Sequence, residues 1–224
     1  MFKSNITSTD YSRFKPSNWD YTKLIHPFRA LLHPAATFEA VKYEKVGSMA
    51  LANLIFLGLI LSGILQFTAT GFIFNMNRTE DFNLIKEILK AALLPVLWCV
   101  ASFSMTTLFD GEGTFEEIWI VTFYAFLPRL LTSIPLSILS NFISIEENVF
   151  ISMTSTIALV FSICLLIVGM MKIHQFSLVR TLLMAVMSVG VIACILFIAM
   201  LLFSMFGQMI SFFESIYEEL YARV

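Results

Sequence analysis

Arg129 is the residue whose type and position most clearly suggest chemistry in this chain. It lies at the middle of a long apolar stretch, 118–140, directly after Pro128 and ahead of Pro135. A charge at the centre of a membrane span costs about 2.5–3.5 kcal/mol on insertion scales. The arginine is therefore expected to face a bundle interior, a water-filled cavity, or backbone carbonyls that the prolines leave free.

Arg129 has two interpretations. It forms an anion or lipid-headgroup site inside a broken helix, or it is a structural arginine that ties the broken backbone to a neighbouring helix. No carboxylate lies at a similar depth in any apolar stretch, which favours the structural interpretation. A helix that breaks at Pro128 would also bring Arg129 closer to the membrane surface.

The other ionisable residues form no recognised site. An acidic turn could bind a cation or a basic partner, but its glutamates also fit the positive start of a helix, the favoured interpretation. It contains Asp110, Glu112, Glu116 and Glu117. The three histidines, His26, His33 and His174, match no metal-ligand spacing. The chain has no GxxxxGK[ST], HExxH, GxSxG or DxD motif, so we predict no catalytic residue, cofactor or metal.

Five apolar stretches must position these residues, and each is longer than the ~20 residues that a helix needs to cross a bilayer. They run over 47–74, 88–109, 118–140, 149–171 and 178–206. Because lipid offers no hydrogen bonds and the stretches do not alternate, they predict helices rather than barrel strands. With 58% hydrophobic and 13% charged residues, the composition agrees. The predicted fold is an all-α membrane protein, a bundle of five transmembrane helices over 47–207.

Isolated polar residues and prolines add local predictions within the first two spans. Asn53 and Gln66 are expected to form hydrogen bonds between helices, because lipid offers them no partner. Thr79 is predicted to cap the second helix. Pro95 lies inside that helix and is predicted to kink it.

The first 46 residues form a basic, soluble arm. Proline suits the first turn of a helix, so we predict a short helix from Pro34 to about Lys45. Phe38 and Val41 lie three residues apart in it, flanked by lysines. This pattern is typical of an interfacial helix with snorkelling lysines, Lys42 and Lys45, that contact the membrane surface or a partner. A solvated linker helix is the alternative.

The last helix is predicted to continue beyond its span as an acidic, amphipathic extension over 208–224. Apolar residues recur at intervals of three and four from Ile210 to Leu220, with Glu214 and Glu218 between them. Such a helix is expected to lie on the outer membrane surface or on the bundle. Glu214 and Glu218 are therefore candidate contacts to the membrane surface or to a partner.

The placement of lysine and arginine predicts the orientation. With the arm in the cytoplasm, nine of these residues lie inside and four outside. The margin is five against four when only residues near the span ends are counted. No signal peptide is evident, because the arm has no short apolar segment with a cleavage site. We predict a multi-pass protein of the cytoplasmic membrane with a cytoplasmic N-terminus and an external C-terminus.

Three segments resemble a known family. Residues 32–39, Leu-His-Pro-Ala-Ala-Thr-Phe-Glu, resemble the P-x-x-T-F entry of bacterial Yip1-domain proteins. Residues 113–115, Gly-Thr-Phe, and 123–128, Phe-Tyr-Ala-Phe-Leu-Pro, resemble the G-x-F and Y-A-x-x-P motifs of the family's third span. The resemblance covers about 24–206 and implies an integral membrane protein without established catalysis. Eukaryotic relatives engage Rab-type GTPases, but the arm lacks their D-L-Y-G-P-type motif, so Rab binding is not carried over.

Together these features predict a non-enzymatic scaffold or accessory subunit of a membrane complex such as a transporter. Its partners would be the lipid bilayer and other membrane subunits or a second copy, and not nucleic acid. The alternative is a homo-oligomeric transporter or channel with a site near a broken third helix. A membrane-embedded lipid enzyme is a third class, for which only the acidic turn supplies clustered polar residues. A third span that is interrupted beside a water-accessible cavity would favour transport, whereas a dry, fully packed Arg129 would exclude it.

Overall fold

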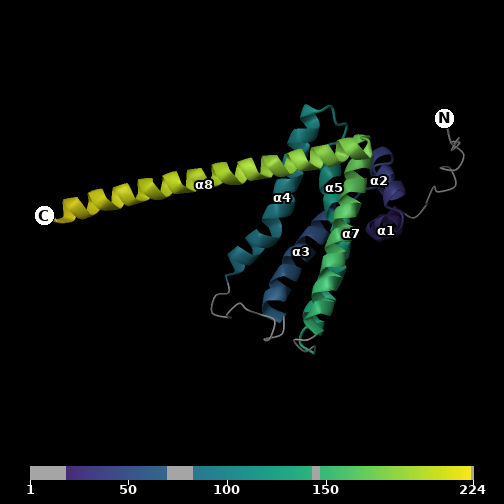
Figure 1. Cartoon of the computed structure of the whole chain (residues 1–224), viewed down its shortest axis with the longest axis horizontal. Helices are drawn as coiled ribbons and strands as arrows, with labels where there is room; N and C mark the ends of the chain where they lie inside the picture. Colours follow the sequence, from purple (N-terminus) through teal and green to yellow (C-terminus); the bar gives the residue numbers. More distant parts are fainter. Residues whose placement is uncertain (1–18, 70–82, 143–146, 223–224) are drawn as a thin grey trace, which may run out of the picture.

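The computed structural model describes residues 19–69, 83–142 and 147–222 of the chain. Their helices are α1 (Trp19–Leu32), α2 (Pro34–Tyr43), α3 (Met49–Ala69), α4 (Leu84–Leu108), α5 (Phe115–Ala125), α6 (Leu127–Leu139), α7 (Asn148–His174) and α8 (Leu178–Ala222). These residues contain no strand, so the predicted all-α fold is confirmed. In Figure 1, α3, α4, α5 and α7 run alongside one another, α2 lies at their flank, and α8 crosses them.

Five helical stretches are long and apolar enough to cross a membrane. They are Met49–Thr68, Leu84–Leu108, Phe115–Leu139, Val149–His174 and Leu178–Glu219. Each corresponds to one of the five predicted spans, and α5 and α6 together make the third. The predicted end of the first span, 70–74, and the predicted cap Thr79 lie outside the described residues. The observed cap of α4 is Asn83, whose side chain accepts a hydrogen bond from the Lys86 backbone N–H.

The predicted arm helix forms as α2, but its apolar face does not lie on a membrane surface. Phe38 and Val41 are 0% and 2% exposed, and they pack among residues of α3, α5 and α7. Gly169 of α7 makes this approach possible, because a Cβ there would lie 3.3 Å from the Phe38 ring. An amphipathic pattern shows that a helix has an apolar face, but not whether protein or lipid covers that face. The surface-helix interpretation of α2 is therefore corrected: this helix belongs to the packed bundle.

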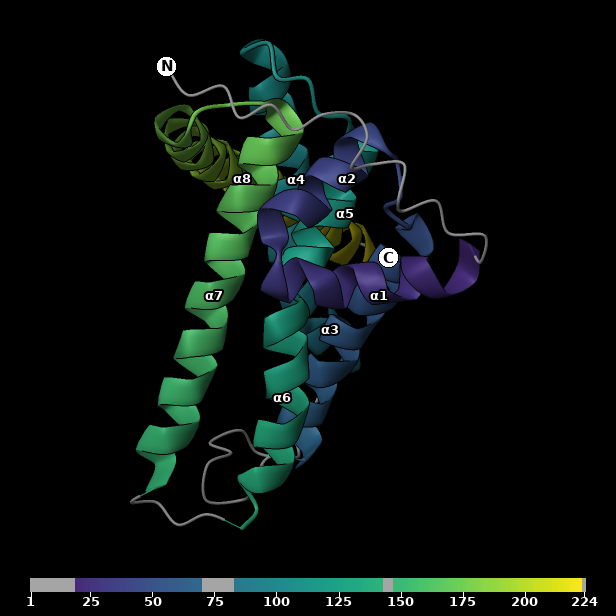
Figure 2. The ribbon, with the colours of Figure 1, turned by 90° about the vertical axis from the view of Figure 1, so that its right-hand side faces the viewer.

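A helix that the sequence analysis did not predict, α1, precedes α2. It continues through Pro27, which removes one backbone hydrogen bond without ending the helix. Ile25, Phe28 and Leu32 lie on one face at intervals of three and four and are exposed. Figure 2 shows α1 lying across the direction of the bundle helices. An exposed apolar face in this orientation is typical of an interfacial helix, the character that the sequence pattern had suggested for α2.

α8 runs as one helix past position 206 and includes the predicted acidic extension. Its buried residues lie on one face toward α4 and are Thr181, Met184, Ser188 and Ile192. Every described side chain after Ile192 is exposed or half-buried, including Glu214 and Glu218. Figure 1 shows the C-terminal part of α8 extending away from the other helices, so it does not lie on the bundle.

Candidate functional site

The third span is interrupted for one residue, Phe126, between α5 and α6. The Phe126 N–H still donates to the Thr122 carbonyl, as in a helix, and also to the Tyr124 carbonyl. The next such bond across the junction is that from the Leu130 N–H to the Phe126 carbonyl, at 3.1 Å. Pro128 lies in the first turn of α6, where its missing N–H leaves no gap in the hydrogen-bond ladder. The interruption thus falls close to the predicted break. Pro135, in contrast, lies inside α6 and does not end it.

The two halves of this span have different surroundings. All residues of α5 from Ile120 to Ala125 are buried. In α6 only Leu127, Pro128, Ser133 and Ser137 are buried. The interruption therefore separates a packed half from a half that is open along one side.

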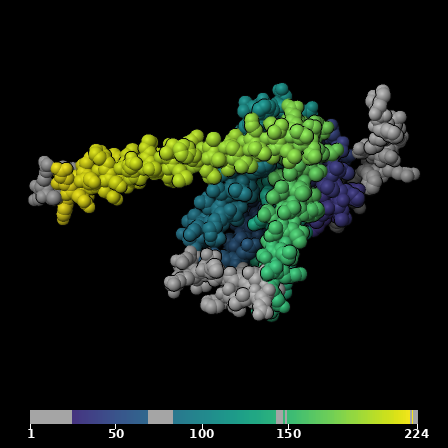
Figure 3. All heavy atoms as spheres, in the orientation of Figure 1, coloured from purple at the N-terminus to yellow at the C-terminus, as the bar shows by residue number. Residues whose placement is uncertain are grey.

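Arg129 is exposed and lines a cavity of about 970 Å³ at the start of the open half. Among the described residues, no side chain forms a hydrogen bond or ion pair with its guanidinium. The contact that the structural interpretation requires, from this side chain to a neighbouring helix, is thus not present there. In Figure 3 the hollow is visible between α4 and α7 below α8, with α3 behind it.

One wall of the cavity is polar. Ser133 and Ser137 lie on the same face of α6 as Arg129, one and two turns further on, and Ser140 follows. Each hydroxyl donates to a backbone carbonyl of its own helix, at distances of 3.0, 2.9 and 2.7 Å. Gln66 of α3 also lines the cavity, where it forms no hydrogen bond with another described helix, contrary to the prediction.

The opposite wall is apolar, and the other two charged residues of the lining neutralise each other. It includes Leu159 and Ile163 of α7 and Val186 and Val189 of α8. The remaining charged lining residues are Glu87 and Lys90 of α4, which form an ion pair of 2.7 Å. Arg129 thus supplies the one uncompensated charge among the described residues of this lining. An anion is the ligand that such a lining favours.

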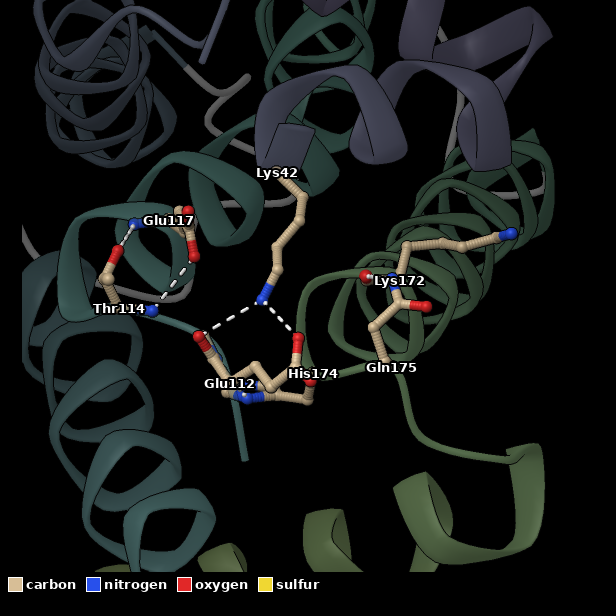
Figure 4. A network of polar contacts seen from close by, with 8 residues as sticks. Lys42, Glu112, Thr114, Glu117, Lys172, His174 and Gln175 are labelled. Atoms are coloured by element: carbon tan, nitrogen blue, oxygen red, sulfur yellow. Dashed lines mark hydrogen bonds and ion pairs between the residues drawn. The ribbon is translucent and has the colours of Figure 1, made fainter. Parts of the chain in front are cut away.

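A second polar cluster lies at the other end of the bundle and holds the acidic turn in place (Figure 4). The Lys42 ammonium lies 3.2 Å from the Glu112 carboxylate and donates to the Glu112 carbonyl at 3.1 Å. The Gly113 N–H donates to His174 Nδ1 at 3.1 Å. Thr114 and Glu117 form a capping box at the start of α5, which confirms the helix-start interpretation for Glu117.

This cluster is structural in its geometry. An added Cβ at Gly113 would lie 2.5 Å from the imidazole of His174, so the glycine allows the turn to pack on that ring. No group of three or more histidine, cysteine, aspartate or glutamate residues suited to a metal ion occurs in the described part of the chain. Of the two candidate contact lysines, Lys42 is engaged in the cluster, whereas Lys45 is exposed.

Contacts between the first and third spans fix the packed half. The Trp119 indole N–H donates to the Asn53 side chain at 2.9 Å, as predicted for Asn53. The Ser48 N–H donates to the Tyr124 hydroxyl at 3.2 Å. The serine stripe of α6, which is Ser133, Ser137 and Ser140, was not predicted, although its spacing of four and three residues after Arg129 is visible in the sequence.

The comparison with protein families identifies a Yip1 domain over residues 28–213. The chain belongs to the Yip1 domain family. The Yip1 domain therefore includes α2 to α7 and most of α8, and with them both the cavity and the polar cluster. No curated protein and no solved structure gives a significant match to this Yip1 protein. Family membership and five apolar helices identify it as a multi-pass membrane protein.

Proposed function

We propose that this Yip1 protein is a non-enzymatic membrane carrier that binds an anionic ligand at Arg129. One observation carries the proposal: a guanidinium without a partner among the described residues, at an interruption of the third span, lines a cavity of about 970 Å³. Transport proteins place substrate sites at interrupted helices near the middle of the bilayer. The cavity lies within one chain, so the carrier does not require the predicted homo-oligomer.

The energetics support an anion at this position. An arginine in a membrane span is stabilised by an opposite charge, by backbone carbonyls or by water. The cavity provides room for such a partner, and Glu87 is already neutralised by Lys90. Charge-assisted hydrogen bonds from a guanidinium to a carboxylate or phosphate are about twice as strong as neutral ones. The site is therefore suited to a ligand with one of these groups.

Cysteine accessibility in intact vesicles tests the proposal. In a background with Cys99, Cys164 and Cys194 replaced by alanine, Ser133→Cys places a thiol in the cavity. We expect it to react with charged, membrane-impermeant methanethiosulfonates, and faster with the anionic sulfonate than with the cationic trimethylammonium reagent. Arg129→Gln should remove this preference, because the arginine attracts the anionic reagent.

The matched control is Thr122→Cys, because Thr122 is fully buried in the packed half of the same span. It should not react with either reagent. If Ser133→Cys is as unreactive as this control, water does not reach Arg129 and the carrier proposal is rejected.

The predicted role as scaffold or accessory subunit is a second candidate, favoured by the long exposed part of α8. From Ala193 to Glu219 no described side chain is buried, and the exposed surface there is largely apolar. A partner subunit in the membrane could cover this surface. Purification from the native membrane in mild detergent, with and without residues 208–224, would test it. A subunit that co-purifies in fixed stoichiometry with the full chain alone supports this role, whereas recovery of the chain without partners contradicts it.

A further inference from the structure

We infer that the ligand of the Arg129 cavity is an anionic phospholipid, whose phosphate lies at the arginine and whose acyl chains lie against α7 and α8. This inference rests on the carrier function proposed above and names its substrate class. Three features of the cavity support it: its two chemically different walls, the spacing of its hydroxyls and its lateral opening.

The walls of the cavity match an amphiphile better than a small ion. Arg129 and the α6 serines form one side, and apolar side chains such as Leu159, Ile163 and Val189 form the other. A small hydrated anion would leave these aliphatic side chains against water, which is unfavourable. A lipid satisfies both walls at once, because its alkyl chains cover the apolar side while its phosphate reaches the guanidinium.

The hydroxyls lie between Arg129 and one end of the bundle. Arg129 is ten residues before Leu139, the last residue of α6, which corresponds to about 15 Å at the rise of a helix. Ser133 and Ser137 occupy the levels in between and Ser140 directly follows Leu139, at steps of about 4.5–6 Å. A hydroxyl that rotates away from its own carbonyl becomes a donor for a phosphate oxygen. A headgroup that enters from this end would therefore meet a donor at each turn before it reaches the arginine.

The cavity opens between helices rather than along the bundle axis. Figure 3 shows the hollow on the side of the molecule, between α4 and α7. In a bilayer this side faces the acyl chains, so a lipid can place its headgroup inside while its chains remain in the membrane. The exposed part of α8 is the alternative occupant of this space, and disulfide formation between α8 and the cavity wall distinguishes it from a lipid.

The test is native mass spectrometry of the full chain from nanodiscs of phosphatidylcholine with a minor share of phosphatidylglycerol. We expect wild-type protein to retain phosphatidylglycerol in preference to the more abundant phosphatidylcholine. Arg129→Gln should lower this retention about tenfold, as expected for the loss of one charge-assisted hydrogen bond. Arg129→Lys should restore most of it, and Lys86→Gln, on an exposed lysine outside the cavity lining, should not change it.

A second variant keeps the test decisive if Arg129→Gln does not fold. Ser137→Leu leaves the arginine in place but fills the path between it and the end of α6. We expect it to slow the flip of fluorescent phosphatidylglycerol in proteoliposomes at least tenfold, with phosphatidylcholine flip as the reference.

The outcomes separate the two proposals. Retention without headgroup preference, or equal retention by Arg129→Gln and wild type, overturns the lipid inference. If Ser133→Cys still reacts with anionic reagents in that case, the carrier function stands with a soluble anion as ligand. A disulfide between native Cys194 of α8 and a cysteine at Ser155, formed in bilayers, would show that α8 fills the cavity and would overturn the inference as well.

Discussion

Gly169→Ala should destabilise the protein, although alanine is the better helix former. A Cβ at this position would lie 2.2 Å from Val121 Cγ1 and 3.3 Å from the Phe38 ring. Carbon atoms pack at about 3.5–4.0 Å, so the first contact is a severe overlap. Val121 is fully buried and β-branched, which leaves it one preferred rotamer in a helix, so turning the methyl group away is unfavourable.

The magnitude follows from two opposing terms. Replacing glycine by alanine inside a helix stabilises it by about 1 kcal/mol. Overpacking a core costs about 1–3 kcal/mol, and an overlap of this size belongs at the upper end. We therefore expect a net loss of about 1–2 kcal/mol. It should appear as a lower midpoint in thermal unfolding in detergent, followed by fluorescence-detected size-exclusion chromatography.

Two variants decide whether the reasoning is right. Gly190→Ala on α8 is the control, because an added Cβ there meets nothing within 4 Å, so it should keep or raise the midpoint. Val121→Ala removes the overlapping methyl group, so the Gly169→Ala/Val121→Ala double variant should be more stable than the sum of the single effects predicts. A Gly169→Ala protein that melts at or above wild type, or strictly additive effects, would refute the proposed contact.

The remaining predictions concern the arm and the polar cluster. Phe38→Ala should lower the free energy of unfolding by about 3–5 kcal/mol and the unfolding midpoint with it, because this ring is fully buried. Phe28→Ala, on the exposed face of α1, should leave the midpoint unchanged. Similar effects of the two variants would mean that α2 lies at a membrane surface. Lys42→Ala should increase amide hydrogen exchange in the acidic turn, and Lys45→Ala should not, because only Lys42 contacts it. Thr114→Ala should cost about 1 kcal/mol through the lost cap of α5, and Thr114→Ser should restore the midpoint.

The membrane spans were predictable from the sequence because length and hydropathy alone decide them. The position of α2 in the bundle could not be predicted from the sequence. Phe38 and Val41 indicate an apolar face, but only contact with Gly169 shows that protein covers it. Since lipid and a protein interior are equally apolar, a sequence pattern does not distinguish them. The helix α1 was not predicted, and the chain remains helical there through Pro27.

The candidate site was predictable in part. The arginine and the nearby interruption follow from the sequence, because a charge in an apolar span and a proline are strong local signals. The open cavity beside Arg129 did not follow. It depends on which faces of the spans meet, and uniformly apolar helices carry little information about their rotation. The serine stripe had a visible spacing, but serines in membrane helices also satisfy their own backbone, as Ser133 and Ser137 do here.

The two halves of the third span explain how Arg129, which pairs with no group in the described part of the chain, is held at a fixed place. α5 is enclosed by α2, α3, α4 and α7. α6 packs mainly on α3 and α7, whereas α4 makes its main contacts with helices other than α6. The cavity lies between α6 and α4, which do not pack closely on each other. Arg129 lies in the first turn of α6, directly beyond the packed half. Its backbone position is therefore set by the packing of α5, whereas its side chain is free to meet a ligand. A variant that loosens the packing of Gly169 against Val121 should therefore weaken ligand binding at Arg129, although neither residue lines the cavity.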